Sequence, residues 1–472
     1  MEVVKPNLKN FVKSLRDIGY TFEIAIADIL DNSISANASK IKIFTVAEPE
    51  LVFAILDDGI GMSTEELVNA MRLATKNPEN ERAKDDLGRF GLGLKTASFS
   101  QCKKLTVISK KNNKLSARQW DLDFIAETDE WYLLKPENEC LKSLPLFDEL
   151  CDQEHGTLVI WQYIDGLKNN NFSDKITKLR QHLSLVFHRF IEGTDMFRSV
   201  SIEVNNNPIK AFNPFNSNHP ATQQLAVEKI KLHDSTINIQ PYILPHHSKL
   251  SQQEYERYAT EDGYTRSQGF YLYRANRLLI YGTWWGLHKA IDAHKLVRIK
   301  IDIPNEQDSL WGIDLKKSTA NPSMEIKNDL KRIINRITEK GSRPYTGRGR
   351  KIDDKSTTMF WKLVPINDEF RFEINEEHPL FKKLLFELPN ETRELFNVYL
   401  KGIQAYLPLD SIQAHLQQNP HKVVQETVLS REEIDKIVEQ LKLSGLDRNS
   451  IDELLKTEIF KNYREAFVND AK

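Results

Sequence analysis

The stretch from Ile26 to Phe44 joins a mostly apolar helical segment directly to an alternating strand. Across residues 21–36 the apolar side chains recur at helical spacing, which predicts a helix with one buried face. The polar residues Asp28, Asp31 and Asn32 interrupt this helix, and Asp28 and Asn32, four residues apart, lie along the same flank. That flank is either solvated or faces a ligand, and the neighbouring motifs decide between the two.

Strand-like alternation follows the helix and returns several times before residue 165. Strands are predicted at 40–46, 51–57, 104–109, 130–135 and 156–164. Helices are predicted at 21–36 and 64–74. We therefore expect the first part of the chain to be an α+β sandwich in which helices cover one face of a sheet.

A second mixed region follows a predicted helix at 174–192. Its predicted strands lie at 200–206, 237–244, 269–282 and 296–304, and its closing helix lies at 322–340. Gly, Pro and positive charge are concentrated just after this helix, as is typical of a linker or exposed loop. The predicted domains are 1–192, 193–340, a basic linker or loop at 341–377, and a helical C-terminal region at 378–472.

Composition limits the class of protein. The 472 residues are 40% hydrophobic and 28% charged with a net charge of −2, so any nucleic-acid binding requires a local basic patch. The cysteines Cys102, Cys140 and Cys151 lack metal-ligand spacing, which favours a reducing compartment, and we expect the cytoplasm. No apolar run approaches the roughly 20 residues that span a bilayer, so we expect no membrane partner.

A glycine-rich turn ends the strand predicted at 51–57. Asp57, Gly59, Gly61 and Met62 form a turn that residues with a Cβ would resist. Such a turn can bring the backbone close to a planar ligand, and a carboxylate at a strand end can accept a hydrogen bond from the exocyclic amine of adenine. Taken alone, the pattern equally describes an ordinary Asp-Gly turn.

A second glycine-rich segment precedes a run with helical character. Gly88, Gly91 and Gly93 let backbone N–H groups approach an anion at a helix start, and Lys95 adds a positive charge. The spacing is neither that of a Walker A loop nor that of a Rossmann fingerprint. The segment is therefore a candidate phosphate cradle of another kind.

Together, in this order, the three motifs resemble the GHKL ATPase superfamily of gyrase, ninety-kilodalton heat-shock chaperones, histidine kinases and mismatch-repair MutL. The resemblance implies a Bergerat fold that uses ATP and Mg²⁺, with Asn32 binding the metal and Asp57 the adenine amine. Thr157 matches a threonine near the adenine. The remaining nucleotide-binding residues that it implies are Gly59, Gly61, Met62, Gly88, Arg89, Phe90, Gly91, Leu92, Gly93, Leu94 and Lys95.

The chain departs from the family at the catalytic position. Hydrolytic members carry glutamate as the base that orients water, whereas this chain has Asp28, one methylene shorter. Because in-line attack depends on accurate placement, the shorter side chain predicts slow ATP hydrolysis.

The resemblance extends over residues 6–340. Gyrase and MutL follow the ATPase domain with a transducer domain, whose loop sends a lysine to the γ-phosphate, and residues 310–323 look like that loop. Lys317 or its neighbour Lys316 is the predicted contact, unless the pair lies on a solvated turn. Within the superfamily, the motifs of this chain most resemble those of MORC-like ATPases, which couple the same two-domain head to nucleotide-driven dimerisation.

Two functions follow from this resemblance. In the first, ATP orders a lid at 63–87 and closes two heads into a dimer that clamps DNA, with the basic segment 343–351 available for phosphate contacts. In the alternative, the chain is a nucleotide-gated subunit, for example of an antiviral defence system, that switches a separate effector protein without binding DNA. The amphipathic tail helices then offer a partner surface, or else pack into a small domain.

Overall fold

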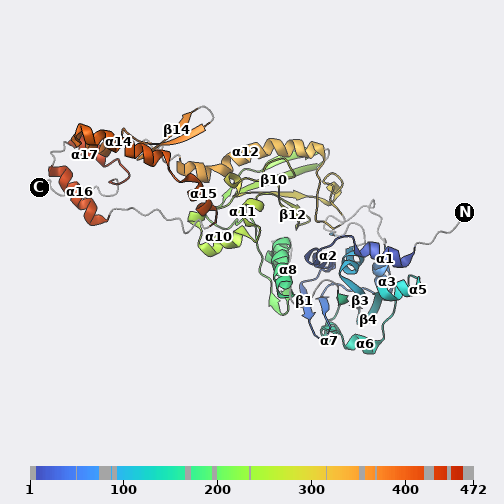
Figure 1. The fold of residues 1–472 in the computed structure, drawn as a ribbon. Coiled ribbons are helices and arrows are strands. Elements are labelled where there is room, and N and C mark those ends of the chain that lie inside the picture. Colours follow the sequence, from blue (N-terminus) through green and yellow to red (C-terminus); the bar gives the residue numbers. More distant parts are fainter. Residues whose placement is uncertain are drawn as a thin grey trace. The chain divides into compact units, whose positions relative to one another are not determined.

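The computed structural model describes most of the chain, namely residues 7–48, 50–73, 87, 93–164, 172–193, 199–232, 235–314, 316–349, 357–366, 369–418, 430–443 and 448–460. The chain forms two compact units (Figure 1). The first comprises Met1–Leu244 and Tyr258–Ile337, and the second comprises Pro245–Arg257 and Thr338–Lys472.

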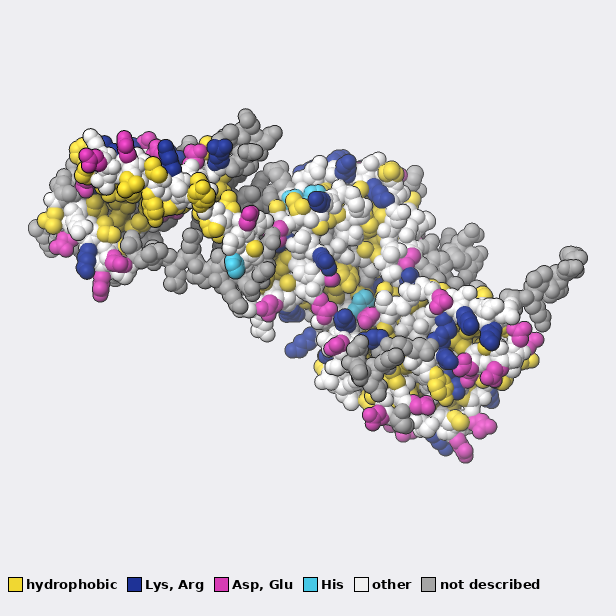
Figure 2. All heavy atoms as spheres, viewed as in Figure 1, with side chains coloured by type: hydrophobic (Ala, Val, Ile, Leu, Met, Phe, Trp, Pro, Cys, Tyr) yellow, Lys and Arg dark blue, Asp and Glu magenta, His cyan; other side chains and the backbone are white. Residues whose placement is uncertain are grey.

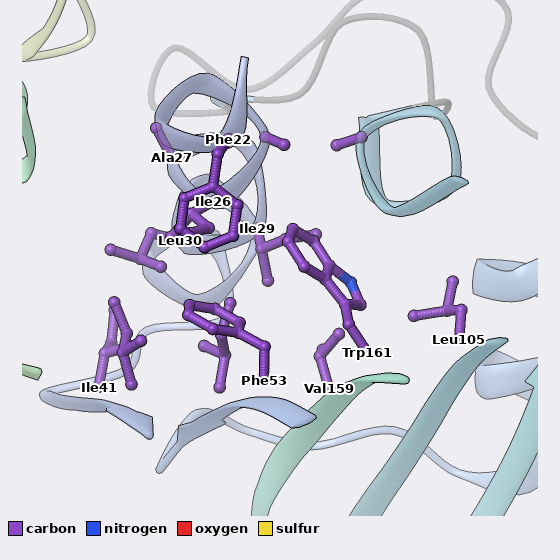
Figure 3. Packing of buried hydrophobic residues seen from close by; sticks show 14 of the residues in the cluster. Phe22, Ile26, Ala27, Ile29, Leu30, Ile41, Phe53, Leu105, Val159 and Trp161 are labelled. Carbon is purple, nitrogen blue, oxygen red and sulfur yellow. The ribbon is translucent and has the colours of Figure 1, made fainter. Parts of the chain in front are cut away.

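The first unit opens with helices α1 (Leu8–Arg16) and α2 (Phe22–Ser35). Thr21 caps α2, because its hydroxyl accepts a hydrogen bond from the backbone N–H of Ile24. The apolar face of α2 packs on the sheet, where the rings of Phe22 and Phe53 meet edge to face with centroids 5.3 Å apart (Figure 3). The helix predicted at 21–36 is thus confirmed to within one residue at each end.

A seven-stranded sheet lies beneath α2, in the order β4-β3-β5-β2-β1-β6-β7. The parallel pair is β1 with β6, and the other neighbours are antiparallel. The strands are β1 (Lys40–Val46), β2 (Val52–Asp57), β3 (Cys102–Lys111), β4 (Lys114–Asp121), β5 (Gly156–Ile164), β6 (Ser201–Val204) and β7 (Asn207–Pro208).

Two sequence predictions about this sheet are wrong. The segment 130–135 is no strand, because Trp131 packs on Trp120 with ring centroids 5.1 Å apart and Leu134 makes an isolated bridge to Gln119. Trp131 and Leu133 therefore pack half-buried on the main core, while Tyr132 remains exposed. The strand at 201–204 belongs to this first sheet, so the predicted boundary after residue 192 falls before the sheet is complete.

Helices cover both faces of the sheet, whereas the sequence predicted one covered face. The larger core lies under α1, α2, α4 (Gly93–Gln101), α5 (Leu122–Thr128) and α8 (Phe172–Val186). On the other face, the short helices α6 (Asn138–Lys142) and α7 (Phe147–Asp152) bury Leu141, Phe147 and Leu150. These helices are too short to show a helical period in the sequence. Helices α3 (Thr64–Met71) and α9 (His188–Glu192) belong to the larger core, which they join through Leu67, Met71 and Phe190.

A second sheet forms the rest of the first unit, in the order β12-β11-β13-β10-β8 with β9 paired to β10. Helix α12 (Met324–Gly349) packs on it through Ile326, Leu330 and Ile333. The other elements of this unit are β8 (Gln223–Gln224), β9 (Glu228–Leu232), β10 (Ser235–Ile243), β11 (Gly269–Arg274), β12 (Arg277–Thr283), β13 (Val297–Ile303), α11 (Gly263–Arg266) and 3₁₀ turns at Asp292–His294 and Asn305–Gln307. The 3₁₀ turn at His247–Lys249 and most of α10 (Gln252–Ala259) belong to the second unit. The predicted strands at 237–244 and 296–304 are confirmed, whereas the strand predicted at 269–282 is a hairpin of β11 and β12 that turns at Ala275 and Asn276.

The predicted linker at 341–377 contains regular structure. Helix α12 continues to Gly349, since extending a helix that is already formed costs far less than starting one. A hairpin of β14 (Trp361–Ile366) and β15 (Glu369–Ile374) follows. The helical tail is confirmed as α13 (Pro379–Glu387), α14 (Asn390–Ala405), α15 (Leu409–Gln418), α16 (Arg431–Leu443) and α17 (Arg448–Leu454). Within the described part of the chain, no helix is long and apolar enough to cross a membrane.

Candidate active site

Helix α2 carries two buried carboxylates, Asp28 and Asp31, each 2% exposed. The Tyr20 hydroxyl donates a hydrogen bond of 3.0 Å to Asp28 Oδ2, and Lys317 Nζ lies 3.1 Å from Asp28 Oδ1. Lys317 Nζ also lies 2.6 Å from Asp31 Oδ2, and Arg277 Nε lies 2.7 Å from Asp31 Oδ1. Two carboxylates and two cations therefore balance one another in a cluster of which Lys317 alone is partly exposed.

The cations of this cluster come from the second sheet and the loop that follows it. Arg277 opens β12, 246 residues after Asp31, and Lys317 lies 289 residues after Asp28. Removing one partner from a buried ion pair leaves an uncompensated charge, so the cluster ties the second sheet firmly to α2.

Of the two candidate lysines, Lys317 reaches the cluster and Lys316 does not. Lys316 Nζ donates instead to the carbonyl oxygen of Gly19 over 3.3 Å. Lys317 has a φ of 54°, a left-handed conformation that is costly for a residue with a Cβ. The side chain of Asp314 supports this turn by accepting from the backbone N–H groups of Ser318 at 2.8 Å and Thr319 at 2.9 Å.

Burial sets the protonation chemistry of the cluster. It raises the pKa of Asp28, while the ammonium of Lys317 acts in the opposite direction and the carboxylate of Asp31 reinforces the rise. Burial and the neighbouring Asp28 carboxylate also raise the pKa of Tyr20. Tyr20 thus keeps its proton and remains a hydrogen-bond donor to Asp28.

Asn32 lies on the exposed side of α2, one turn after Asp28. Its Nδ2 donates a hydrogen bond of 3.0 Å to the carbonyl oxygen of Asp28. The amide nitrogen is thereby engaged, so the side-chain oxygen is the atom that can coordinate a cation. One amide oxygen suits Mg²⁺, which takes one or two protein oxygens beside waters and substrate phosphates. Within the described residues, no group of three or more His, Cys, Asp or Glu side chains forms a metal cluster.

Asp57 ends β2 as a buried carboxylate, which accepts hydrogen bonds from Ser33 and from the backbone of Gly59. Ser33 Oγ donates to Asp57 Oδ2 over 2.7 Å, and the Gly59 N–H donates to Oδ1 over 2.9 Å. Burial raises the pKa of Asp57 to about 6, although both hydrogen bonds act to lower it. Thr157 lies opposite Asp57 on β5, and its hydroxyl is 2.9 Å from that of Ser109.

The turn after Asp57 requires glycine for packing reasons. A Cβ on Gly61, whose φ is +63°, would lie 2.0 Å from the carbonyl oxygen of Lys110. A Cβ on Gly59 would lie 2.9 Å from Ala36 and from Asp57 Oδ1. The Met62 N–H donates to Ser109 Oγ over 2.8 Å, which fixes the end of the turn.

The second glycine-rich segment is described from Gly93, where α4 begins, while Gly88, Arg89, Phe90, Gly91 and Leu92 lie outside the described residues. A Cβ on Gly93 would lie 3.6 Å from Asp28 Oδ2, so the start of α4 faces the carboxylate cluster. Leu94 packs on the main core. Lys95 is buried, and its Nζ donates to the carbonyl oxygen of Ala70 over 2.9 Å.

Of the predicted lid at 63–87, residues 74–86 lie outside the described part.

Sequence reasoning missed several groups of this site. Ser33 carried a signal, because it is a hydroxyl on the otherwise apolar face of α2. Tyr20 and Arg277 carried none: the position of Tyr20 is set by the entry into α2, and the partner of Arg277 lies far away in the sequence. Asp31 was noted as a polar residue of the helix, but the sequence did not indicate its partners.

Comparison with known families identifies the domain that holds this site. The model of the histidine kinase-, DNA gyrase B- and HSP90-like ATPases matches residues 20–157, which contain Asp28, Asn32, Asp57 and Thr157. The chain carries a GHKL ATPase domain. Its α+β sandwich is the Bergerat fold that the sequence motifs imply.

Parts of this chain are also similar to curated MORC ATPases. ATPase MORC2B of Mus musculus is 30% identical over 99 residues, 20% of this chain and 9% of that protein. ATPase morc-1 of Caenorhabditis elegans is 30% identical over 118 residues, 25% of this chain and 13% of that protein. The matches therefore span a small part of the relatives' length. The solved ATPase and transducer domains of DNA topoisomerase II from Balamuthia mandrillaris align with a TM-score of 0.40 at 14% identity, covering 70% of this chain and 86% of that one.

Proposed function

We propose that this protein binds and slowly hydrolyses ATP, and that hydrolysis is coupled to movement of the second sheet. The observation that carries the proposal is the contact of Lys317 with Asp28 and Asp31, because it joins a loop beyond the second sheet to the centre of the GHKL domain. ATP adds a γ-phosphate that competes with these carboxylates for the ammonium of Lys317.

In the proposed complex, Asn32 contributes an oxygen to Mg²⁺, and Asp57 accepts a hydrogen bond from the adenine amine. Thr157 and the turn formed by Gly59, Gly61 and Met62 border the base. The segment from Gly88 to Lys95 surrounds the phosphates. Bound Mg²⁺ offsets the charge of the triphosphate.

Asp28 is the proposed catalytic base. A carboxylate paired with an ammonium is a poor proton acceptor, so Asp28 becomes effective when Lys317 moves to the γ-phosphate. The raised pKa that burial gives Asp28 then favours proton abstraction from water. The movement of Lys317 and the activation of Asp28 both depend on the γ-phosphate. ATP and ADP therefore stabilise different arrangements of the two sheets.

We infer that this exchange drives a clamp, in which ATP closes two GHKL domains into a dimer around DNA. One observation favours the alternative, a nucleotide-gated subunit that switches a separate effector. Three lysines on β3 pair with neighbouring carboxylates, which weakens them as contacts for DNA phosphates. The pairs are Lys103 with Asp123, Lys104 with Asp121 and Lys111 with Glu66.

ATP turnover measured with and without duplex DNA separates the clamp from the switch. Stimulation by DNA supports the clamp, and activity that depends on a partner protein supports the switch.

Lys317→Ala tests the coupling, with Lys316→Ala as a matched control. We expect Lys317→Ala to lower kcat about 10- to 100-fold and to remove the preference for ATP over ADP, because the lost contact belongs to the γ-phosphate. Lys316→Ala should stay within a few fold of wild type, since Lys316 contacts the carbonyl of Gly19. Steady-state kinetics and calorimetric titration measure both effects, and equal behaviour of the two variants would contradict the proposal.

The raised pKa of Asp57 predicts a pH-dependent affinity. The adenine amine needs the ionised carboxylate as its acceptor, so ADP affinity should fall as the pH drops through about 6, by up to about tenfold per pH unit. Asp57→Asn should bind ADP more weakly, and this step should vanish from its profile. A wild-type affinity that is constant between pH 7 and 5 would exclude Asp57 as the adenine reader.

A further inference from the structure

The carboxylate of Asp28 is held at both of its oxygens, by partners from different parts of the chain. Lys317, from the loop beyond the second sheet, lies 3.1 Å from Oδ1. The Tyr20 hydroxyl donates to Oδ2 over 3.0 Å, and Tyr20 directly precedes the N-cap of α2, the helix that carries Asp28. Movement of the second sheet therefore withdraws Lys317 from Asp28 but leaves Tyr20 in place.

Tyr20 is itself fixed by α4, the helix that begins at Gly93 in the candidate phosphate-binding segment. The hydroxyl groups of Thr96 and Tyr20 are hydrogen-bonded. Because the Tyr20 hydroxyl gives its own proton to Asp28, Thr96 is the donor in this pair. Gln101 Nε2, at the end of α4, donates to the backbone carbonyl oxygen of Tyr20 over 3.2 Å. Helix α4 thus holds Tyr20 at both its side chain and its backbone.

The hydrogen-bond chain from Thr96 through Tyr20 to Asp28 lies inside the protein. Figure 2 shows positive and negative side chains interspersed over the surface of the first unit, where water competes with each contact. Thr96, Tyr20 and Asp28 are instead buried. Hydrogen bonds in a low-dielectric interior are stronger than those at the surface, so this chain can fix the plane of the Asp28 carboxylate.

The chemistry of Tyr20 suits it to hold a base. The ammonium of Lys317 favours the ionised carboxylate and so makes Asp28 a poor proton acceptor. A phenol hydroxyl is neutral, and burial together with the Asp28 carboxylate raises the pKa of Tyr20, so it keeps its proton. Tyr20 can therefore stay bonded to one oxygen of Asp28 while the other oxygen accepts a proton.

We propose that Tyr20 is the positioning residue of the catalytic base, holding Asp28 Oδ2 throughout the ATP cycle so that Oδ1 takes the proton of the attacking water once Lys317 leaves it. This inference rests on the proposed role of Asp28. In that step the water oxygen bonds to the γ-phosphorus and its proton passes to Oδ1. The bond from the γ-phosphorus to the bridging oxygen breaks, and its electron pair leaves with ADP. The proton then passes from Oδ1 to solvent, which restores the base.

Tyr20→Phe tests the proposal, because it removes the hydroxyl and keeps the buried ring. We expect kcat to fall about tenfold, since a carboxylate free to rotate is less often aligned with the water. Affinity for a non-hydrolysable ATP analogue should stay within about twofold of wild type, because Tyr20 does not hold the nucleotide. Tyr271→Phe is the matched control with unchanged kcat, since that buried hydroxyl donates to the carbonyl oxygen of Ser267.

A second variant separates positioning from stability. Tyr20→Phe removes one acceptor from the buried Thr96 hydroxyl, which lowers stability. Combining it with Thr96→Val removes both hydroxyl groups, so thermal stability should move back toward wild type while kcat stays about tenfold low. Recovery of kcat together with stability would show that Tyr20 only supports the fold, and would overturn the proposal.

A double-mutant cycle with Asp28→Asn provides the decisive measurement. Because Tyr20 acts through Asp28, adding Tyr20→Phe to Asp28→Asn should change the residual single-turnover rate by less than about twofold. A further tenfold loss in that background, or an unchanged kcat in Tyr20→Phe alone, would also overturn the proposal. Wild-type turnover in Asp28→Asn would instead contradict the proposed function, so the two failures are distinguishable.

Discussion

Asp28→Asn is expected to lower ATP turnover by about 10² to 10⁴ while leaving ATP affinity within a few fold of wild type, the range typical of losing a positioned base. Asparagine has nearly the shape of aspartate and keeps one of the two oxygens, which can accept from either Tyr20 or Lys317. It cannot take a proton from water. Single-turnover kinetics and titration with a non-hydrolysable ATP analogue measure the two quantities separately.

The same variant should accumulate in the closed state, because opening requires loss of the γ-phosphate contact. Light scattering at saturating ATP should then show a larger fraction of head-closed species than in wild type. Asp28→Glu is the complementary variant, and faster hydrolysis in it would show that the reach of aspartate limits the natural protein. Wild-type turnover in Asp28→Asn would remove Asp28 from the mechanism.

Asn32→Ala is expected to abolish Mg²⁺-dependent ATP binding, with affinity falling about 100-fold or more. The substitution removes the side-chain oxygen from a hard cation that demands near-octahedral coordination. Asn32 is exposed and its amide nitrogen contacts a carbonyl oxygen of its own helix, so the fold should tolerate alanine. Calorimetric titration of ATP with Mg²⁺ and with EDTA measures the loss.

Two further substitutions make this result specific. Asn32→Asp keeps an oxygen ligand and should restore part of the Mg²⁺-dependent affinity. Ser35→Ala, at another exposed position near the end of α2, should bind ATP like wild type. If Asn32→Ala binds ATP equally well with Mg²⁺ and with EDTA, and as tightly as wild type, the metal lies elsewhere.

Local patterns in the sequence determined the elements around the site. The period of apolar residues in 21–36 determined α2, and alternation determined β1, because burial of one face imposes a period of 3.6 or 2 on the side chains. Strand β2 is instead a continuous apolar run, because both of its faces are buried. The four-residue spacing of Asp28 and Asn32 likewise put both on one flank. Glycines at 59 and 61 marked a tight turn whose reason the structure supplies, namely the carbonyl of Lys110 and the side chain of Ala36.

The partners of the polar residues were decided by the tertiary structure alone. Asp31 meets Arg277, and Asp28 meets Lys317 rather than Lys316, across 246 and 289 residues of chain. No local pattern in the sequence predicts such pairings, because charges that compensate each other in a buried cluster need only be close in space. The segment 130–135 shows the same limit, since its alternation is real but Trp131 and Leu133 pack half-buried on the core without forming a strand. The sequence thus determined which faces are buried, and the topology determined which charges meet there.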